Sequence, residues 1–207
     1  MKKISDSTIG RLSRYYRTLT ELMEKKVLTI SSNEIANINS ITSAQVRKDL
    51  SFFGTFGKRG LGYNTELLRN QIGKILGLEK TWNVGLAGFG NIGRALIGYQ
   101  EFKKQGFHIK AIFDNDPALF GQQIEGIKIS NVKKACEVVK DKQLDIIIIA
   151  VPAKYAQSLI DTFLECGIRA FLNFAPTSVK VPDNVVVKNE NMSIELEALS
   201  FFLMNKK

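Results

Sequence analysis

The chain of 207 residues has little of the chemistry on which metal sites and many enzymes depend, because it contains only one histidine and two cysteines. Cys136 and Cys166 stand 30 residues apart with no histidine near either, and this spacing excludes a zinc site and a disulfide framework. The longest apolar run, residues 146–152, is much shorter than the ~18 residues of a membrane span and fits one buried strand. The first residues lack the apolar segment of a signal peptide. We therefore expect a cytoplasmic protein with no bound metal and no membrane contact.

The positive charge is concentrated in the first part of the chain. The net charge is +9, and residues 1–80 hold 14 basic and 7 acidic side chains, whereas residues 81–207 hold 15 and 13. With 44% hydrophobic and 24% charged residues, the chain can bury a core. A basic first part is typical either of a solvated helical face or of a module that binds a polyanion, and charge alone does not separate the two.

The first 80 residues have the pattern of a helix-turn-helix. Apolar side chains recur at helical spacing over residues 8–25. Ser31 and Glu34 are placed to form a capping box, and Thr42 and Gln45 form a second one eleven residues later. Two helix starts at this distance leave room for a short helix and a tight turn, as in DNA-binding helix-turn-helix domains.

The second of these helices has two chemically different faces. Val46, Leu50 and Phe53 fall on one side at 100° per residue and face the core. The other side carries small or hydrogen-bonding side chains that fit a major groove. These candidate DNA-contacting residues are Ser43, Ala44, Gln45, Arg47, Lys48 and Ser51.

Residues 54–63 predict a hairpin with a basic tip. Four glycines in ten residues allow tight turns, and Phe56 and Tyr63 are placed to anchor the two arms. Directly after a recognition helix, such a hairpin is the wing of a winged helix, whose tip at Lys58, Arg59 and Gly60 would reach phosphates or the minor groove. A nucleotide phosphate loop is the alternative, but the P-loop spacing is missing.

A glycine motif opens the second part of the chain. Gly88, Gly90 and Gly93 form a G-x-G-x-x-G pattern between the predicted strand of residues 82–87 and a predicted helix. In this position the first glycine permits the turn, the second lets backbone approach a pyrophosphate, and the third allows close packing of helix and strand. The pattern therefore predicts a dinucleotide-binding domain.

An acidic residue follows at the distance that this fold requires. Asp114 ends the predicted strand of residues 107–113, 21 residues after Gly93, where a carboxylate binds the adenosine ribose hydroxyls. A carboxylate there repels a 2′-phosphate, so NAD(H) is favoured over NADP(H). Asp116 is a substitute candidate, and an aspartate that only caps the turn before Pro117 is the structural alternative.

Further strands and helices complete an α/β pattern. Strands are expected at residues 145–152, 170–173 and 185–187, with a helix at 154–166. The final helix, residues 194–204, is apolar nearly all round and must be buried on most sides, either in a partner subunit, which we favour, or against its own sheet.

Catalytic residues are not evident. His108, the one histidine, lies inside a predicted strand, where a structural role is expected. Tyr99 and Lys103 match a dehydrogenase spacing but lie on the helix directly after the glycine motif, which is the wrong element for that chemistry. The second domain is therefore expected to hold a dinucleotide without using it in a reaction.

The whole chain resembles the Rex family of bacterial redox-sensing transcriptional repressors. Five sequence segments carry this resemblance, namely residues 45–51, 53–54, 56–63, 88–93 and 173–176. The resemblance implies a homodimer with exchanged C-terminal helices that binds a palindromic operator. It also implies that NADH releases the DNA, that NAD⁺ competes without releasing it, and that the target genes serve fermentation or respiration.

The resemblance also implies a role for each matching residue and three segments. A winged-helix domain would span residues 1–80, a Rossmann-type domain 81–191, and a dimerisation helix 192–207. Arg47, Lys48, Lys58 and Arg59 would contact DNA. The adenosine diphosphate half would be held by Gly88, Gly90, Asn91, Ile92, Gly93 and Asp114, and the nicotinamide half by Tyr99, Val151, Pro152, Asn173, Phe174 and Ala175.

One position departs from the family pattern. Some members pair an acid just before the last helix with an arginine of the first helix. Arg17 matches that arginine, but Asn191 stands at the position of the acid, so a neutral hydrogen bond would have to replace the ion pair. Two rival classes stay open: an NAD-dependent enzyme with a fused DNA-binding domain, and a repressor that senses another nucleotide such as coenzyme A.

Overall fold

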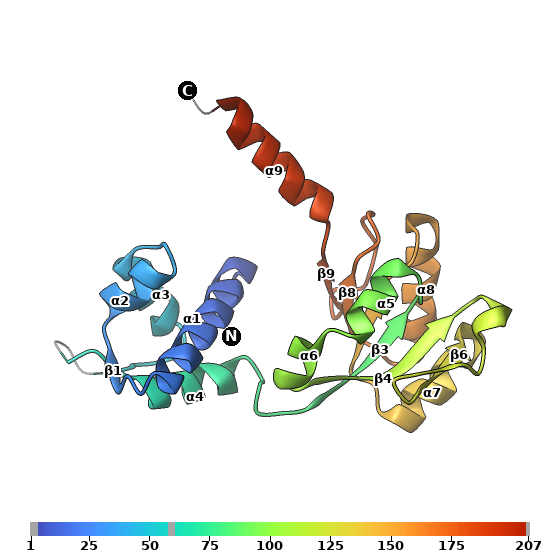
Figure 1. Ribbon diagram of the computed structural model, residues 1–207, viewed down its shortest axis with the longest axis horizontal. Coiled ribbons are helices and arrows are strands. Elements are labelled where there is room, and N and C mark those ends of the chain that lie inside the picture. Colours follow the sequence, from blue (N-terminus) through green and yellow to red (C-terminus); the bar gives the residue numbers. More distant parts are fainter. Residues whose placement is uncertain (1–3, 58–60, 206–207) are drawn as a thin grey trace. The chain divides into compact units, whose positions relative to one another are not determined.

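The computed structural model describes residues 4–57 and 61–205, and the chain divides into two compact units, Met1–Lys80 and Thr81–Lys207. Figure 1 shows a helical first unit and a second unit built around a sheet.

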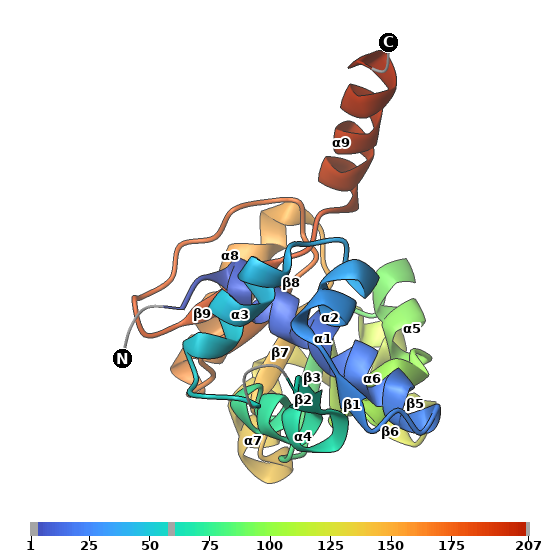
Figure 2. The same ribbon diagram turned by 90° about the vertical axis from the view of Figure 1, so that its left-hand side faces the viewer.

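The first unit is a small helical bundle with a short two-stranded sheet (Figure 2). Its core gathers apolar side chains from all four helices, among them Leu12, Ile35, Val46 and Leu68. The elements are α1 (Asp6–Glu24), β1 (Thr29–Ile30), α2 (Ser32–Ile38), α3 (Ser43–Ser51), β2 (Tyr63–Asn64) and α4 (Thr65–Ile75).

Both predicted helix starts are present, but only the first is a complete capping box. The Ser31 side chain accepts from the backbone N–H of Glu34, and the Glu34 carboxylate accepts from that of Ser31. Thr42 likewise accepts from the N–H of Gln45. The reciprocal half of the second box was predicted wrongly, because the Gln45 amide donates to Asp49 at 2.8 Å. The carboxylate lies one turn along the helix, and the charge-assisted bond from the Gln45 NH₂ group directs this side chain away from the Thr42 N–H.

Asp49 is the buried centre of a polar cluster that joins α3 to α1. It is 0% exposed, and its carboxylate accepts from Arg11 Nε at 2.6 Å, Arg11 Nη2 at 2.7 Å and the Tyr15 hydroxyl at 2.8 Å. Burial alone would raise the pKa of Asp49, but the hydrogen bonds from Arg11, Tyr15 and Gln45 outweigh it and the pKa lies below its usual value. The carboxylate therefore stays charged and fixes α3 on α1.

The predicted wing differs from the structure in its strand pairing. The Tyr63 arm pairs antiparallel with β1, with Ile30 opposite Tyr63, and the arm around Phe56 forms no strand. The arms do meet: a side chain at Gly57 would come within 2.8 Å of the Tyr63 ring. Phe56 and Tyr63 both pack on the core of the first unit, as expected of hairpin anchors.

The second unit contains a seven-stranded sheet with the order β5-β6-β4-β3-β7-β8-β9. All neighbours are parallel except the β5–β6 hairpin. If the six strands other than β5 are numbered 1 to 6 in chain order, their order across the sheet is 3-2-1-4-5-6. This is the strand order of a Rossmann fold. The strands are β3 (Trp82–Ala87), β4 (Phe107–Asp114), β5 (Gln123–Ile124), β6 (Ile127–Asn131), β7 (Ile146–Ile149), β8 (Ala170–Asn173) and β9 (Val186–Asn189).

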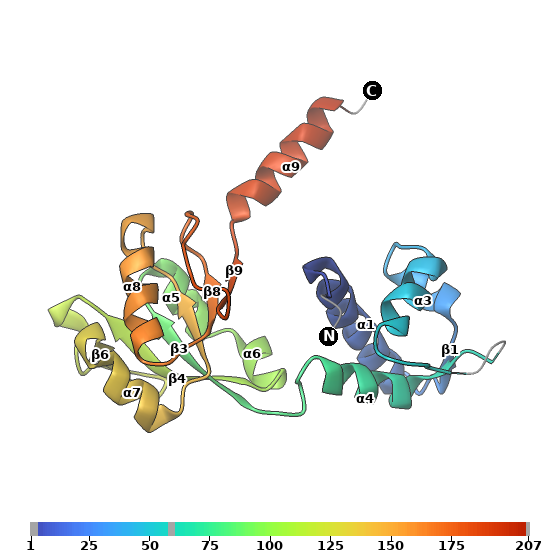
Figure 3. The same cartoon turned by 180° about the vertical axis from the view of Figure 1, so that it is seen from behind.

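Helices cover both faces of this sheet. The core on one face includes Ile97 from α5 with Phe102 of α6 packed against it, and the core on the other includes Val139 from α7 and Phe163 from α8. Figures 1 and 3 show the two layers from opposite sides. The helices are α5 (Asn91–Ile97), α6 (Gln100–Lys104), α7 (Ala135–Lys142) and α8 (Ala153–Glu165), with short 3₁₀ turns at Pro117–Leu119 and Val132–Lys134.

The two cysteines form a disulfide, which overturns the expectation drawn from their spacing. Cys136 lies in the first turn of α7 and Cys166 is the C-cap of α8, with Cα atoms 4.7 Å apart. The error has a plain cause, since a separation of 30 residues says nothing about distance when two helices pack side by side on one sheet face.

The last helix, α9 (Met192–Asn205), extends from the end of β9 (Figure 1). It contains no buried residue, although most of its side chains are apolar. The exposed apolar side chains are Met192, Ile194, Leu196, Leu199, Phe201, Phe202, Leu203 and Met204.

No helix within residues 4–57 and 61–205 is both long and apolar enough to cross a membrane. The same ranges contain no group of three or more His, Cys, Asp or Glu side chains that could hold a metal ion.

Replacing Asp49 tests the buried cluster. We expect Asp49→Ala to destabilise the first unit by about 3 kcal/mol, because Arg11 and the Tyr15 hydroxyl lose their acceptor in a buried environment. Hydrogen exchange of α1 and α3 in the full chain measures this unit separately. Glu101→Ala removes the exposed partner of Lys104 and serves as the control with no measurable effect.

The lowered pKa of Asp49 sets the sign of the pH dependence. The contribution of Asp49 is complete above its unfolded pKa of about 4 and is lost as the pH falls through the lower folded value. The difference between wild type and Asp49→Ala should therefore shrink only below about pH 4, and a constant difference down to pH 2 would contradict the assignment.

Candidate functional sites

The glycine turn lies where a parallel sheet of this order opens a crevice. β3 pairs with β4 on one side and with β7 on the other, so the chain crosses over in opposite directions from β3. Ligands of such sheets bind beyond the carboxyl ends of the strands at this switch point. Gly88 directly follows β3 and therefore begins the turn at that position.

Two of the three glycines are required by close packing. Gly88 has φ +100°, and a Cβ there would lie 2.6 Å from Cγ1 of Val151 and collide with the carbonyl oxygen of Ala150. A Cβ at Gly93 would collide with the carbonyl oxygen of Gly88. Among the described residues, apart from its own chain neighbours, none lies within 4 Å of the Cβ position of Gly90, so there is open space there. A bound diphosphate needs this combination of tight backbone and one open glycine.

The start of α5 faces this open space. Its N-cap is Gly90, so no N-cap side chain accepts a hydrogen bond from the N–H groups of the first turn. Asn91 and Ile92 in that turn are exposed. Backbone N–H groups at a helix start attract anions. Arg94 adds a positive charge that sequence reasoning missed: its guanidinium lies 4.8 Å from the Phe89 ring centroid, and Nε donates to the Phe89 carbonyl at 3.3 Å.

Asp114 connects the end of β4 to the glycine turn. Its Oδ2 accepts from the N–H of Phe89 at 2.7 Å, and its Oδ1 accepts from the N–H groups of Asn115 and Asp116. A carboxylate has about four lone-pair sites, so capacity for ribose hydroxyls is left. Asp116 caps the following 3₁₀ turn by accepting from the N–H of Ala118. Both aspartates therefore cap backbone near Pro117, and Asp114 in addition contacts the glycine turn through the N–H of Phe89.

The residues predicted at the nicotinamide half divide into exposed and buried ones. Val151 is half-buried against Gly88, and Pro152 is exposed at the start of α8. Asn173 is buried, and its amide donates to the carbonyls of Ala175 and Thr177 and to Oδ1 of Asn189. Its Oδ1 accepts from the N–H of Ala175, so Asn173 shapes the loop after β8. In that loop Phe174 is half-buried and Ala175 buried.

Tyr99, the last residue predicted at the nicotinamide half, lies one short helix away from the glycine turn. It follows α5, whereas the glycine turn precedes it, and the seven residues of α5 span about 10 Å. Its ring packs edge-on against Phe102 at 5.1 Å between centroids. Together with His108 it lines a separate hollow of 590 Å³ near the start of β4.

The first unit presents the predicted face of α3 to solvent. Arg47, Lys48 and Ser51 are exposed, while Ser43 and Gln45 are half-buried. Arg47 Nη1 donates to Ser32 Oγ at 3.0 Å, which holds its guanidinium over the start of α2. Lys58, Arg59 and Gly60 lie outside the described residues.

A tyrosine beside this face carries an altered pKa. Burial raises the pKa of Tyr63, while the positive charge of Arg47 works against the increase. The Arg47 side chain therefore lies close enough to the wing residue to influence it electrostatically.

Family comparisons agree with the two-unit division of these sites. Residues 3–51 match a family described as a putative DNA-binding protein N-terminus. Residues 79–177 match a family described as a CoA binding domain.

Individual relatives cover nearly the whole chain. The redox-sensing transcriptional repressor Rex of Carboxydothermus hydrogenoformans is 46% identical over 199 residues, 96% of each chain. The same repressor of Clostridioides difficile is 39% identical and covers 100% of this chain and 98% of its own.

Solved structures also match nearly the whole chain. A Rex-family repressor named RSP, in complex with NAD⁺ and operator DNA, has a TM-score of 0.93 at 40% identity and covers 98% of this chain and 94% of its own. RSP in complex with NADH has a TM-score of 0.88 at 39% identity, with coverage of 98% and 95%. The chain therefore belongs to the Rex family of redox-sensing transcriptional repressors.

Proposed function

We propose that this chain is a cytoplasmic homodimeric repressor that binds a palindromic operator and releases it when NADH binds. The glycine turn carries the proposal: it joins a tight backbone, one open glycine and the Asp114 carboxylate at the switch point of the sheet. The solved relatives that resemble this chain throughout bind NAD⁺, NADH or operator DNA.

Residues 81–191 of the second unit are the proposed dinucleotide domain. The backbone at Gly88, Gly90 and Gly93 and the first turn of α5 with Asn91 and Ile92 would hold the diphosphate, with Asp114 on the adenosine ribose. Val151, Pro152, Phe174 and Ala175 would border the nicotinamide, and Asn173 would fix their loop. Tyr99, which follows α5, would border the nicotinamide as well.

The first unit, residues 1–80, is the proposed DNA-binding domain. In this arrangement Arg47, Lys48 and Ser51 of α3 enter the major groove, with Ser43 and Gln45 at its edge and Lys58, Arg59 and Gly60 at the wing tip. The Arg11–Asp49 pair keeps α3 in a fixed orientation, since Asp49 is in the same helix as the DNA-contacting side chains.

Residues 192–207 are the proposed dimerisation segment. A helix with this many exposed apolar side chains does not persist in water without a cover, and a second copy of the chain supplies one by symmetry. Asn191 accepts from the N–H of Ser193 through its Oδ1, so the residue at the position of the family acid is a helix cap in this chain.

The two sites are coupled through the dimer. Two recognition helices related by a two-fold axis must meet half-sites about one helical turn apart, so a change in the angle between the subunits removes one helix from its groove. Coupling is reciprocal, so bound operator must weaken NADH binding by the same factor by which NADH weakens operator binding.

A coenzyme A sensor is a second candidate, because the matched family is described as a CoA binding domain. The Asp114 carboxylate disfavours it, since coenzyme A carries a phosphate on the adenosine ribose.

One titration separates these candidates. Labelled palindromic operator with bound protein is titrated with NADH, NAD⁺, NADPH and coenzyme A in turn, by fluorescence anisotropy. We expect release with NADH alone, and NAD⁺ should raise the NADH concentration required. Retention of the operator at saturating NADH would refute the proposal, and release by coenzyme A would favour the second candidate.

Removing one lysine tests the DNA-binding face. Lys48→Ala should weaken operator binding and reduce the slope of log K against log salt by about 1, because one phosphate contact and its released counterion are lost. Lys74→Ala removes the same charge from the exposed last turn of α4 and should leave both quantities unchanged. An unaltered salt slope in Lys48→Ala would rule out a phosphate contact.

Asp114→Ala tests the ribose contact. The variant should lower the preference for NADH over NADPH by about tenfold, or about 1.4 kcal/mol, because the charge that repels a 2′-phosphate is gone. Direct binding of both nucleotides, followed by nicotinamide fluorescence, measures the ratio. Asp116→Ala removes an equal charge two residues away and is the matched control with an unchanged ratio.

A further inference from the structure

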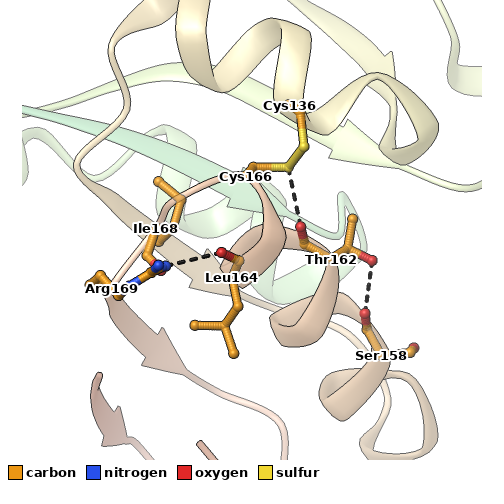
Figure 4. The surroundings of a disulfide bond; sticks show 7 residues. All are labelled: Cys136, Ser158, Thr162, Leu164, Cys166, Ile168 and Arg169. Carbon is orange, nitrogen blue, oxygen red and sulfur yellow. Dashed lines mark hydrogen bonds between the residues drawn. A yellow bond between two sulfur atoms is a disulfide. The ribbon is translucent and has the colours of Figure 1, made fainter. Parts of the chain in front are cut away.

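The Cys136–Cys166 disulfide lies at a surface that small thiols and disulfides can reach. Figure 4 shows it between the first turn of α7 and the end of α8. Cys136 is exposed and Cys166 is half-buried. Disulfides in cytoplasmic proteins are transient and redox-sensing more often than structural. The exposed position of this disulfide therefore fits a bond that forms and breaks in the cell.

The two sulfur atoms have different surroundings. Cys136 is exposed in the first turn of α7, with Lys133 and Lys134 just before it and Glu137 directly after it. Sγ of Cys166 lies 3.1 Å from the carbonyl oxygen of Thr162. A disulfide sulfur carries no hydrogen, so this contact becomes a hydrogen bond only after reduction, when the Cys166 thiol can donate.

The bond spans the helical layer that supports the dinucleotide site. α8 begins at Ala153, directly after Val151 and Pro152, and ends at the cysteine that α7 holds. Phe163 of α8 packs on Phe113 at 5.1 Å between ring centroids, and Phe113 precedes Asp114. The layer thus contacts both borders of the glycine turn, and the disulfide links its two helices covalently.

We propose that Cys136 and Cys166 form a reversible thiol–disulfide pair that gives the chain a second redox input, from the thiol pool, and that its oxidised form binds NADH more tightly. The Cys136 thiolate attacks a low-molecular-weight disulfide and releases one thiolate. Cys166, after losing its proton to water, then attacks the Cys136 sulfur and releases the second. Two protein thiols and one small disulfide thus become one protein disulfide and two small thiols.

The direction of the effect follows from order in the α7–α8 layer. The closed disulfide restricts the end of α8, so less conformational freedom is left to be lost when a dinucleotide orders the loop at Val151 and Pro152. The readout of this inference rests on the proposed function, because it uses NADH as the probe.

The experiment equilibrates the full chain with defined ratios of reduced and oxidised glutathione and counts free thiols with a mass-tagged maleimide. NADH affinity and NADH-dependent operator release are then measured for the fully reduced and fully oxidised forms. We expect complete oxidation by oxidised glutathione, reversal by the reduced form, and NADH affinity about fivefold higher in the oxidised chain. A ratio above twofold in this direction supports the proposal.

Two variants give the controls. Cys136→Ser and Cys166→Ser cannot close the bond, so both should show one NADH affinity, that of the reduced wild type, under either condition. Cys166→Ser keeps the exposed thiol and should form a mixed disulfide with glutathione without changing that affinity.

Three results separate this inference from the proposed function. Failure of glutathione to oxidise the pair, or equal NADH affinities of the two forms within twofold, overturns the inference alone. Absence of NADH binding to either form overturns the proposed function as well as the coupling, while the thiol count still decides whether the pair is reversible.

Discussion

The close approach of three backbone segments at the glycine turn is the constraint on which the second unit depends. Gly88 lies against the backbone of Ala150, and Gly93 lies against the carbonyl of Gly88, so β3, α5 and the end of β7 meet without side chains between them. This contact places the first turn of α5 and the end of β4 at one edge of the sheet. Asp114 strengthens the arrangement by accepting from the N–H of Phe89. For a dinucleotide site, no other part of the fold has to be positioned as accurately as these backbone segments.

The first unit holds the short helix α3 rigidly, while the outer face of that helix stays exposed. α3 has only nine residues, and two of them, Val46 and Leu50, are apolar and buried. The buried charge of Asp49 supplies the missing anchorage through Arg11 and Tyr15. The cost of burying this carboxylate is offset because four donors, two of them from one guanidinium, satisfy it. The exposed cations of α3 are thereby held in one orientation, as the proposed contact with DNA requires.

Local sequence patterns predicted most of the helices and strands. They did not predict the contacts between segments that lie far apart in the chain. The helix starts at Ser31 and Thr42 and the glycine turn follow from a few adjacent residues, since caps and tight turns are local. The Arg11–Asp49 pair joins residues 38 apart and has no local signal. No helix or strand was predicted within residues 118–144, which contain the β5–β6 hairpin and α7, because their short apolar stretches fit no single period. The wing arm at Tyr63 pairs with β1, a partner that no spacing indicates.

By itself the sequence determined the two-domain organisation, the outward face of α3, the glycine turn and the acid at the end of β4, because each depends on side-chain spacing or on the conformational freedom of glycine. Only the tertiary structure decided which carboxylate meets the turn, where the Gln45 amide binds, and how the Tyr99 ring packs. It also brought Cys136 and Cys166 together. These outcomes depend on distances between segments that are remote in the chain, and such distances are set by the packing of helices on the sheet.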